Sequence, residues 1–281
     1  MKKRALRILP AYYIILLISF LLGGAMSTFH YADKTENLIS AFGFYPIYPE
    51  HPPFYVDDNG MYGIRWTLNY EVFFYLMVAI SVLFKNRLTC LAILLSSTLI
   101  ILPLSSGYEL SLNPDGYRFN SAMLGLMSNP MIFLFVIGAL IGFSYPHLKI
   151  IPKKLKVSLT IICMIMTTYL FSNGLCVSHG LLSSGWAYGL LLLSFVMAEE
   201  QISRYVPNVM VELGNISFSL YLIHTLMNNG IGKRFSDFGV PDGYLRFTIS
   251  IILSCLLAWF SYQYIERPIS LRNKISTRVH S

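Results

Sequence analysis

The sequence is poor in charged residues and contains no cysteine motif. Only 12% of its 281 residues are charged, whereas soluble domains average about 25%. No two cysteines form a CxxC pair or a cluster with histidine, and all lie in or beside apolar runs: Cys90, Cys163, Cys176 and Cys255. This spacing supports neither a metal site nor a disulfide framework, and indicates small buried apolar residues instead.

Dense basic runs are also missing, although the net charge is +7. Nucleic-acid binding needs Lys and Arg gathered on one surface, so this distribution argues against such a partner. The first apolar stretch follows Met1–Arg7, is long enough to cross a bilayer, and is not followed by a small-residue cleavage site. We therefore expect no cleavable signal peptide.

Apolar residues dominate what is present. The sequence is 55% hydrophobic, with a mean hydropathy of +0.57. A water-soluble fold of this length cannot bury that much apolar surface. We therefore predict an all-α integral membrane protein, a polytopic helix bundle forming one domain over residues 1–281. About eight transmembrane helices are expected, at residues 10–28, 67–84, 88–106, 130–146, 157–177, 183–198, 209–230 and 246–265.

The distribution of basic residues predicts the orientation of these spans. With the N-terminus inside, 15 of the 21 Lys and Arg residues fall on cytoplasmic segments. Such an excess is the positive-inside signal, and an odd number of spans would break the alternation. The chain is expected in the inner membrane with both termini cytoplasmic.

The longest outer loop is predicted at residues 29–66. It is rich in proline and tyrosine, and it also carries Asp57 and Asp58. Closely spaced prolines forbid a continuous helix and favour a rigid, extended path. The loop is either the place where an acceptor sugar binds or a lid packed on the bundle. Further along, the GxxxG pattern Gly138–Gly142 predicts a close helix–helix contact.

Two ionisable side chains lie within predicted spans. Glu71 is five residues below the outer edge of one span, and His224 is six residues from the outer end of another. At about 1.5 Å per residue, both sit at similar depth in the outer half of the bilayer. A Glu beside a His would set the tautomer of the ring and raise its basicity, as in a general base. Alternatively, each makes a separate structural hydrogen bond.

A second polar group is expected at the cytoplasmic face. Arg4 and Arg7 are three residues apart and share one face of a helix, and Glu266-Arg267 ends the last span. Arginine suits phosphate because its planar guanidinium donates two hydrogen bonds at once. The alternative is ordinary basic anchoring together with a Glu–Arg pair at a helix end.

Four blocks of this sequence resemble the membrane acyltransferase-3 family. They match its R-x-x-R-I-x-P-x-Y, W-[ST]-L-x-x-E-x-x-F-Y, L-G-x-I-S-Y-S-L-Y-L-I-H and Y-x-x-I-E-R-P motifs in that order. Here they read RALRILPAYY at 4–13, WTLNYEVFFY at 66–75, LGNISFSLYLIH at 213–224 and YIERP at 264–268. Together they cover nearly the whole chain.

The resemblance implies a membrane O-acyltransferase that moves an acyl group, usually acetyl from cytoplasmic acetyl-CoA, to a hydroxyl of a surface glycan. The implied partners are the lipid bilayer and a glycan acceptor, which is either free or lipid-linked. The resemblance implies no metal cofactor. His224 and Glu71 are the expected base and its orienter, and Arg4 and Arg7 the expected donor-binding pair. The residues expected to support the site structurally are Trp66, Tyr75, Glu266 and Arg267.

One feature departs from the family pattern. Members usually begin with two spans before the R-x-x-R block, which here starts at Arg4. The first of those spans carries a basic residue and then a His thought to be catalytic. Three explanations are open: the true start lies upstream, the chain is a truncated member that no longer catalyses, or His224 carries the role of the base alone. A glycan transporter or polymerase of the envelope pathway is the runner-up function.

Overall fold

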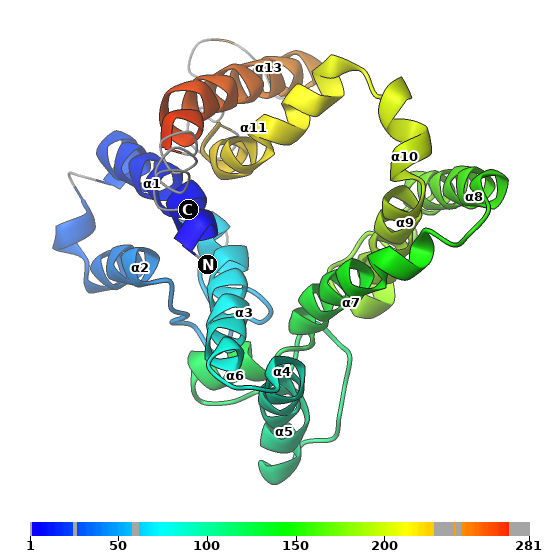
Figure 1. Ribbon diagram of the computed structural model, residues 1–281. Helices are drawn as coiled ribbons and strands as arrows, with labels where there is room; N and C mark the ends of the chain where they lie inside the picture. Colours follow the sequence, from blue (N-terminus) through cyan, green and yellow to red (C-terminus); the bar gives the residue numbers. More distant parts are fainter. Residues whose placement is uncertain (1, 25–26, 58–61, 228–238, 240–242, 270–281) are drawn as a thin grey trace, which may run out of the picture. The chain divides into compact units, whose positions relative to one another are not determined.

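The computed structural model describes residues 2–24, 27–57, 62–227, 239 and 243–269, with side chains except those of residues 2–4, 7, 23 and 24. All regular elements in these ranges are helical (Figure 1). They form two compact units: Met1–Ile47, Val56–Asn69 and Pro207–Ser281 make unit 1, and Tyr48–Tyr55 and Tyr70–Val206 make unit 2.

Unit 1 is built from helices at both ends of the sequence. Its core is a cluster of buried apolar side chains that includes Ala11, Leu38, Leu222 and Ala258, none more than 7% exposed. Helices α11 and α13 run side by side, and α1 packs against α11 (Figure 1). The elements are α1 (Lys2–Ser19), η1 (Phe20–Gly24), η2 (Thr28–His30), α2 (Ala32–Gly43), η3 (Gly63–Arg65), the start of α3 (Trp66–Val82), α11 (Asn208–Thr225), α13 (Tyr244–Ser261) and η10 (Tyr262–Glu266).

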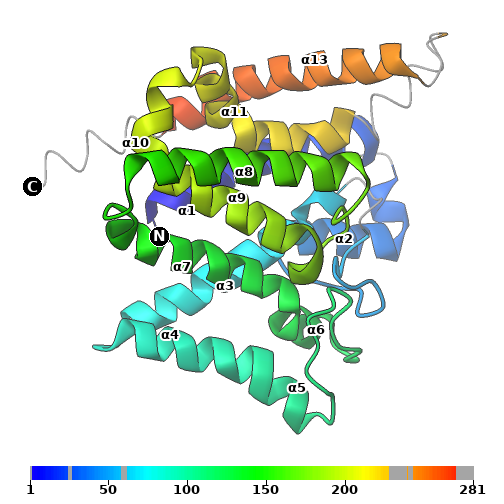
Figure 2. The ribbon, with the colours of Figure 1, turned by 90° about the vertical axis from the view of Figure 1, so that its right-hand side faces the viewer.

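Unit 2 holds the rest of α3 and the middle of the sequence. Helix α9 packs against both α7 and α8 (Figure 2). Its further elements are α4 (Arg87–Ser96), η4 (Ser97–Ile101), α5 (Leu102–Ser105), α6 (Ala122–Ser128), η5 (Pro130–Ile132), α7 (Phe133–Leu148), α8 (Lys153–Ser172), η6 (Leu181–Gly185), α9 (Trp186–Met197), α10 (Glu199–Ile202) and η7 (Ser203–Tyr205).

The apolar helices confirm an all-helical, membrane-type fold. Four stretches are long and apolar enough to cross a bilayer: Arg87–Ser105, Pro130–Leu148, Lys153–Ser172 and Tyr244–Ile269. A fifth is counted if Leu181–Met197 and Glu199–Tyr205, bent by 68°, form one span. Within Lys153–Ser172 only 17% of the most apolar window is buried, so the outer surface is suited to lipid rather than water.

Each predicted span overlaps helix over the residues that the structure describes, but the number of crossings stays a prediction. Helices α3 and α11 begin within a residue or so of the predicted positions, yet neither meets the length and hydropathy of a full span over the described residues. Ile8–Leu22 is apolar but shorter still. Polar residues lower the hydropathy of such helices, as the exposed Glu212 and the half-buried Asn215 do in α11.

Two local expectations are wrong. The outer loop is not extended throughout, because α2 occupies Ala32–Gly43 and the proline-rich part begins only at Pro46. The GxxxG glycines also make no close contact: a Cβ at Gly138 or Gly142 would meet no described atom within 4 Å. Helix α7 is approached closely at Gly185 instead, where a Cβ would lie 2.4 Å from a methyl carbon of Leu134.

A buried arginine joins α2 to the start of α3. The Arg65 side chain is 0% exposed. Its Nη1 donates to the carbonyl of Tyr62 at 2.8 Å, and its Nη2 donates to Asn37 Oδ1 and Ser40 Oγ, both at 3.1 Å. Because a buried guanidinium is costly without such acceptors, these bonds determine how α2 packs next to η3.

Replacing Arg65 should therefore destabilise the protein. We expect Arg65→Met to lower the free energy of unfolding by roughly 2–4 kcal/mol, because the buried acceptors on Asn37 and Ser40 lose their donor. Thermal denaturation in detergent measures this, and Arg118→Met, at an exposed arginine, is the matched control. Equal melting temperatures for the two variants would contradict the role assigned to Arg65.

Candidate active site

His224 lies near the end of α11 and is oriented by its own helix. Its Nδ1 is 2.6 Å from the carbonyl oxygen of Tyr221, one turn earlier. A carbonyl oxygen can only accept, so Nδ1 carries the proton and Nε2 carries the lone pair. The Thr225 hydroxyl lies 3.3 Å from Nε2. The exposed imidazole is therefore in the tautomer that a general base requires.

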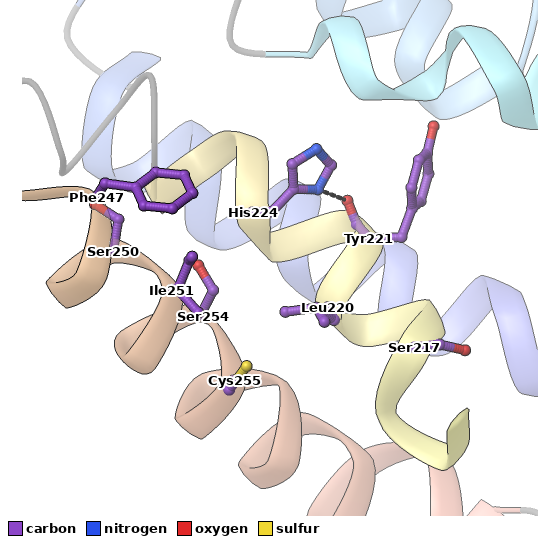
Figure 3. A pocket seen from close by; sticks show the side chains of 9 residues that line it. All are labelled: Ser217, Leu220, Tyr221, His224, Phe247, Ser250, Ile251, Ser254 and Cys255. Carbon is purple, nitrogen blue, oxygen red and sulfur yellow. Dashed lines mark hydrogen bonds between the residues drawn. The ribbon is translucent and has the colours of Figure 1, made fainter. Parts of the chain in front are cut away.

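His224 lines a groove between α11 and α13. The groove has a volume of about 480 Å³. Figure 3 shows the imidazole and the Tyr221 ring on one side of α11, with the Nδ1–carbonyl bond between them. The lining residues are Ser217, Leu220, Tyr221, His224, Phe247, Ser250, Ile251, Ser254 and Cys255. A mostly apolar groove with a few convergent polar groups is the usual form of a ligand site.

Tyr221 connects this histidine helix to the segment that precedes and begins α3. Its hydroxyl donates to the carbonyl of Ile64 at 2.9 Å and is also hydrogen-bonded to the Thr67 hydroxyl. The rings of Tyr221 and His224 have centroids 5.7 Å apart. Two of the blocks that suggested the family, 66–75 and 213–224, therefore meet through these hydroxyls.

A buried carboxylate lies at the other end of the same helix pair. Glu266 is only 2% exposed and ends η10, a π-helical turn, a distortion that is frequent at functional sites. The Ser219 hydroxyl donates to Glu266 Oε1 at 2.6 Å and lies 2.7 Å from the hydroxyl of Ser261. Arg267 instead donates to the Gln263 side chain at 2.8 Å. The carboxylate thus joins α11 to the end of α13.

Glu71 lies in unit 2, whereas His224 lies in unit 1. The Tyr75 hydroxyl, one turn further along α3, donates to Glu71 Oε1, and both side chains are half-buried. The predicted pairing of Glu71 with His224 stays a prediction. Within unit 1, the group that sets the His224 tautomer is the Tyr221 carbonyl.

The donor-binding prediction rests on the first turns of α1. Arg4 and Arg7 lie on one continuous helix, so their backbone positions share a face. Their side chains lie outside the described part of the structure. Trp66 is the first residue of α3 and is half-buried. Among the described residues, no group of three His, Cys, Asp or Glu side chains is placed to bind a metal.

The residues that sequence reasoning missed are hydroxyl-bearing neighbours of the predicted ones. Thr67 and Tyr221 contact each other, while Ser219 and Ser261 surround Glu266. Three of the four lie inside the blocks that resemble the family. The i, i+3 spacing of Tyr221 and His224 was the one signal that could have shown that they share a face of α11.

The family is decided by comparison with known sequences. The family profile described as "Acyltransferase domain" matches residues 1–263. The chain belongs to the acyltransferase-3 family. It is also 24% identical over 211 residues to the exopolysaccharide production protein ExoZ of Rhizobium meliloti (strain 1021), an alignment that covers 74% of this chain and 62% of that protein. No solved structure matches this acyltransferase-3 chain.

The family match agrees with the membrane-type fold. Several apolar helices together with acyltransferase-3 membership make the chain a multi-pass membrane protein. The match includes the whole of α11 and the whole of α13, so the groove beside His224 belongs to the family domain.

Loss of the Ser219 hydroxyl should weaken the junction of α11 and α13. We expect Ser219→Ala to lower the free energy of unfolding by about 1.5–3 kcal/mol, because a buried carboxylate loses a charge-assisted hydrogen bond. Ser217→Ala is the control, since that exposed hydroxyl bonds only the Gly214 carbonyl of its own helix within the described residues. Urea or thermal unfolding in detergent distinguishes them, and identical stabilities would argue against the junction.

Proposed function

We propose that this protein is an inner-membrane O-acyltransferase with eight spans and both termini in the cytoplasm. It takes an acetyl group from cytoplasmic acetyl-CoA and places it on a hydroxyl of an envelope polysaccharide or its lipid-linked precursor. The observation that carries the proposal is His224, an exposed imidazole whose Nδ1 is bonded to a backbone carbonyl and which lines a groove of an acyltransferase-3 domain.

The acceptor class is supported by the relative. ExoZ is named for exopolysaccharide production, and this chain is 24% identical to it over 211 residues. A polysaccharide hydroxyl has a pKa far above 7 and is a poor nucleophile until a base removes its proton. A neutral, exposed imidazole with an acceptor nitrogen is suited to that step.

The reaction that we propose is a direct acyl transfer. Nε2 of His224 accepts the proton of the acceptor hydroxyl while its oxygen attacks the thioester carbonyl. The C–O ester bond forms, the C–S bond breaks, and the departing CoA thiolate takes the proton back from the imidazolium. We assign the electrostatic stabilisation of the imidazolium to Glu71, whose carboxylate accepts a hydrogen bond from Tyr75.

Donor binding is assigned to the first turns of α1. The phosphates of CoA carry several negative charges, and two arginines one turn apart can bind them with paired hydrogen bonds. Positions 4 and 7 occur near the start of α1, among the basic residues that predict a cytoplasmic end. The thioester would then extend from this end toward the level of His224.

Removal of the base should abolish transfer. We expect His224→Gln to lower kcat at least about 100-fold, because general-base catalysis supplies roughly 10²–10⁴-fold. The measurement uses purified protein, acetyl-CoA labelled in the acetyl group, and polysaccharide or lipid-linked glycan from the native envelope. His51→Gln, at an exposed histidine of unit 2, is the control.

Each other outcome of this assay has a distinct meaning. No transfer by the unmodified protein would favour an inactive family member, and glycan movement without label transfer would favour a transporter or polymerase. Full activity of His224→Gln would overturn the assignment of the base. Glu71→Gln should lower kcat with little change in the KM for acetyl-CoA, since Glu71 is assigned to the reacting groups and not to the nucleotide.

Loss of the two arginines should instead weaken donor binding. We expect Arg4→Ala with Arg7→Ala to raise the Kd for acetyl-CoA by about 10- to 100-fold, as each charged hydrogen bond contributes roughly 1.5–3 kcal/mol. Equilibrium binding in detergent measures this directly. Lys153→Ala with Lys154→Ala removes the same charge from another predicted cytoplasmic segment, and equal losses for both pairs would indicate nonspecific attraction only.

A further inference from the structure

The imidazole of His224 has no direct tie to any other helix. Among the described residues its ring nitrogens bond only Tyr221 and Thr225, which are both on α11. Its direction is therefore determined by the rotation of α11 about its own axis. Because general-base catalysis depends on heavy-atom distances within about 2.6–3.2 Å, a small rotation of this helix would misplace Nε2.

Tyr221 is the residue that opposes such a rotation. The Ile64 carbonyl can only accept, so the single Tyr221 proton is donated to it at 2.9 Å. The Thr67 hydroxyl must then donate to the Tyr221 oxygen. The Tyr221 hydroxyl thus makes two hydrogen bonds to the residues around the start of α3. Both bonds link α11 to another segment of the chain.

The same residue also holds the imidazole itself. The Tyr221 carbonyl accepts the Nδ1 proton at 2.6 Å, and the two rings lie 5.7 Å apart, centroid to centroid, at an interplanar angle of 44°. Tyr221 and His224 are one turn apart, so anchoring the first directs the second. Figure 3 shows both side chains leaving α11 in the same general direction.

We propose that Tyr221, anchored by Thr67 and the Ile64 carbonyl, is a positioning residue that aims Nε2 of His224 at the acceptor hydroxyl. This inference rests on the proposed function. Tyr221 transfers no proton in it, because its own proton is committed to the Ile64 carbonyl. Thr67 acts through Tyr221 in the same way, since its hydroxyl completes the anchor.

The test compares variants that remove one hydroxyl each. We expect Tyr221→Phe to lower kcat about tenfold while the KM for acetyl-CoA stays unchanged, because the donor is bound elsewhere. The pKa read from the pH profile of kcat/KM should not shift, because Phe keeps the backbone carbonyl that bonds Nδ1. Thr67→Val should have the same effect, and Thr67→Ser, which keeps the hydroxyl, should retain most of the activity.

Combining the variants tests whether both hydroxyls serve one contact. Tyr221→Phe with Thr67→Val should be no worse than Tyr221→Phe alone, since each removes the same anchor. Tyr264→Phe, at a tyrosine 72% exposed on η10, is the control for losing a phenol hydroxyl. If Tyr221→Phe fails to fold, Thr67→Val and Thr67→Ser decide the question by themselves.

Measuring His224→Gln in parallel separates the two proposals. If His224→Gln is inactive while Tyr221→Phe and Thr67→Val keep the unmodified kcat, the positioning role is wrong and the proposed function stands. If His224→Gln is fully active, the proposed base and this inference both fail. A shifted pH profile in Tyr221→Phe would also overturn positioning, because it would make the phenol part of the titrating system.

Discussion

Pairing of buried polar groups is the constraint on which this structure depends. Lipid offers no hydrogen bonds, so every hydroxyl and charge placed inside the bundle needs a protein partner. Arg65, Glu266 and Tyr221 are the examples that matter most. Each bonds a partner outside its own helix, and each bond links segments that hydrophobic packing alone would leave free to slide. The polar pairs therefore determine how the helices are positioned along one another, while apolar contacts make the helices associate.

This division matters for the proposed catalysis because His224, the proposed base, lies on a helix surface. The Tyr221 carbonyl determines which nitrogen of His224 carries the proton, and the Tyr221 hydroxyl determines which way the helix presents it. The buried Glu266–Ser219 contact holds the same helix two residues before Tyr221. A groove whose lining is mostly apolar can thus contain one well-oriented imidazole.

The proposed function depends on two faces of the membrane. The donor is expected at the cytoplasmic start of α1, where Arg4 and Arg7 lie, and the base is expected in the outer half of the bilayer. Such a layout separates a soluble cytoplasmic donor from an envelope acceptor, so the thioester has to enter the protein interior. The low charge content and the exposed apolar surface of helices such as α8 follow from a location in the membrane.

Much of the fold and part of the site follow from the sequence itself. Hydropathy and length place every predicted span on a helix, and four motif blocks predict the family, because both depend on local order along the chain. The sequence also identified His224 and Glu71 as unusual, since ionisable groups in apolar runs are costly. Their partners could not be predicted. Thr67 and Tyr221 are 154 residues apart, and no periodicity connects hydroxyls so distant along the chain. Only the packing of α11 near the start of α3 brings them together, so the orientation of the base was decided by the tertiary structure.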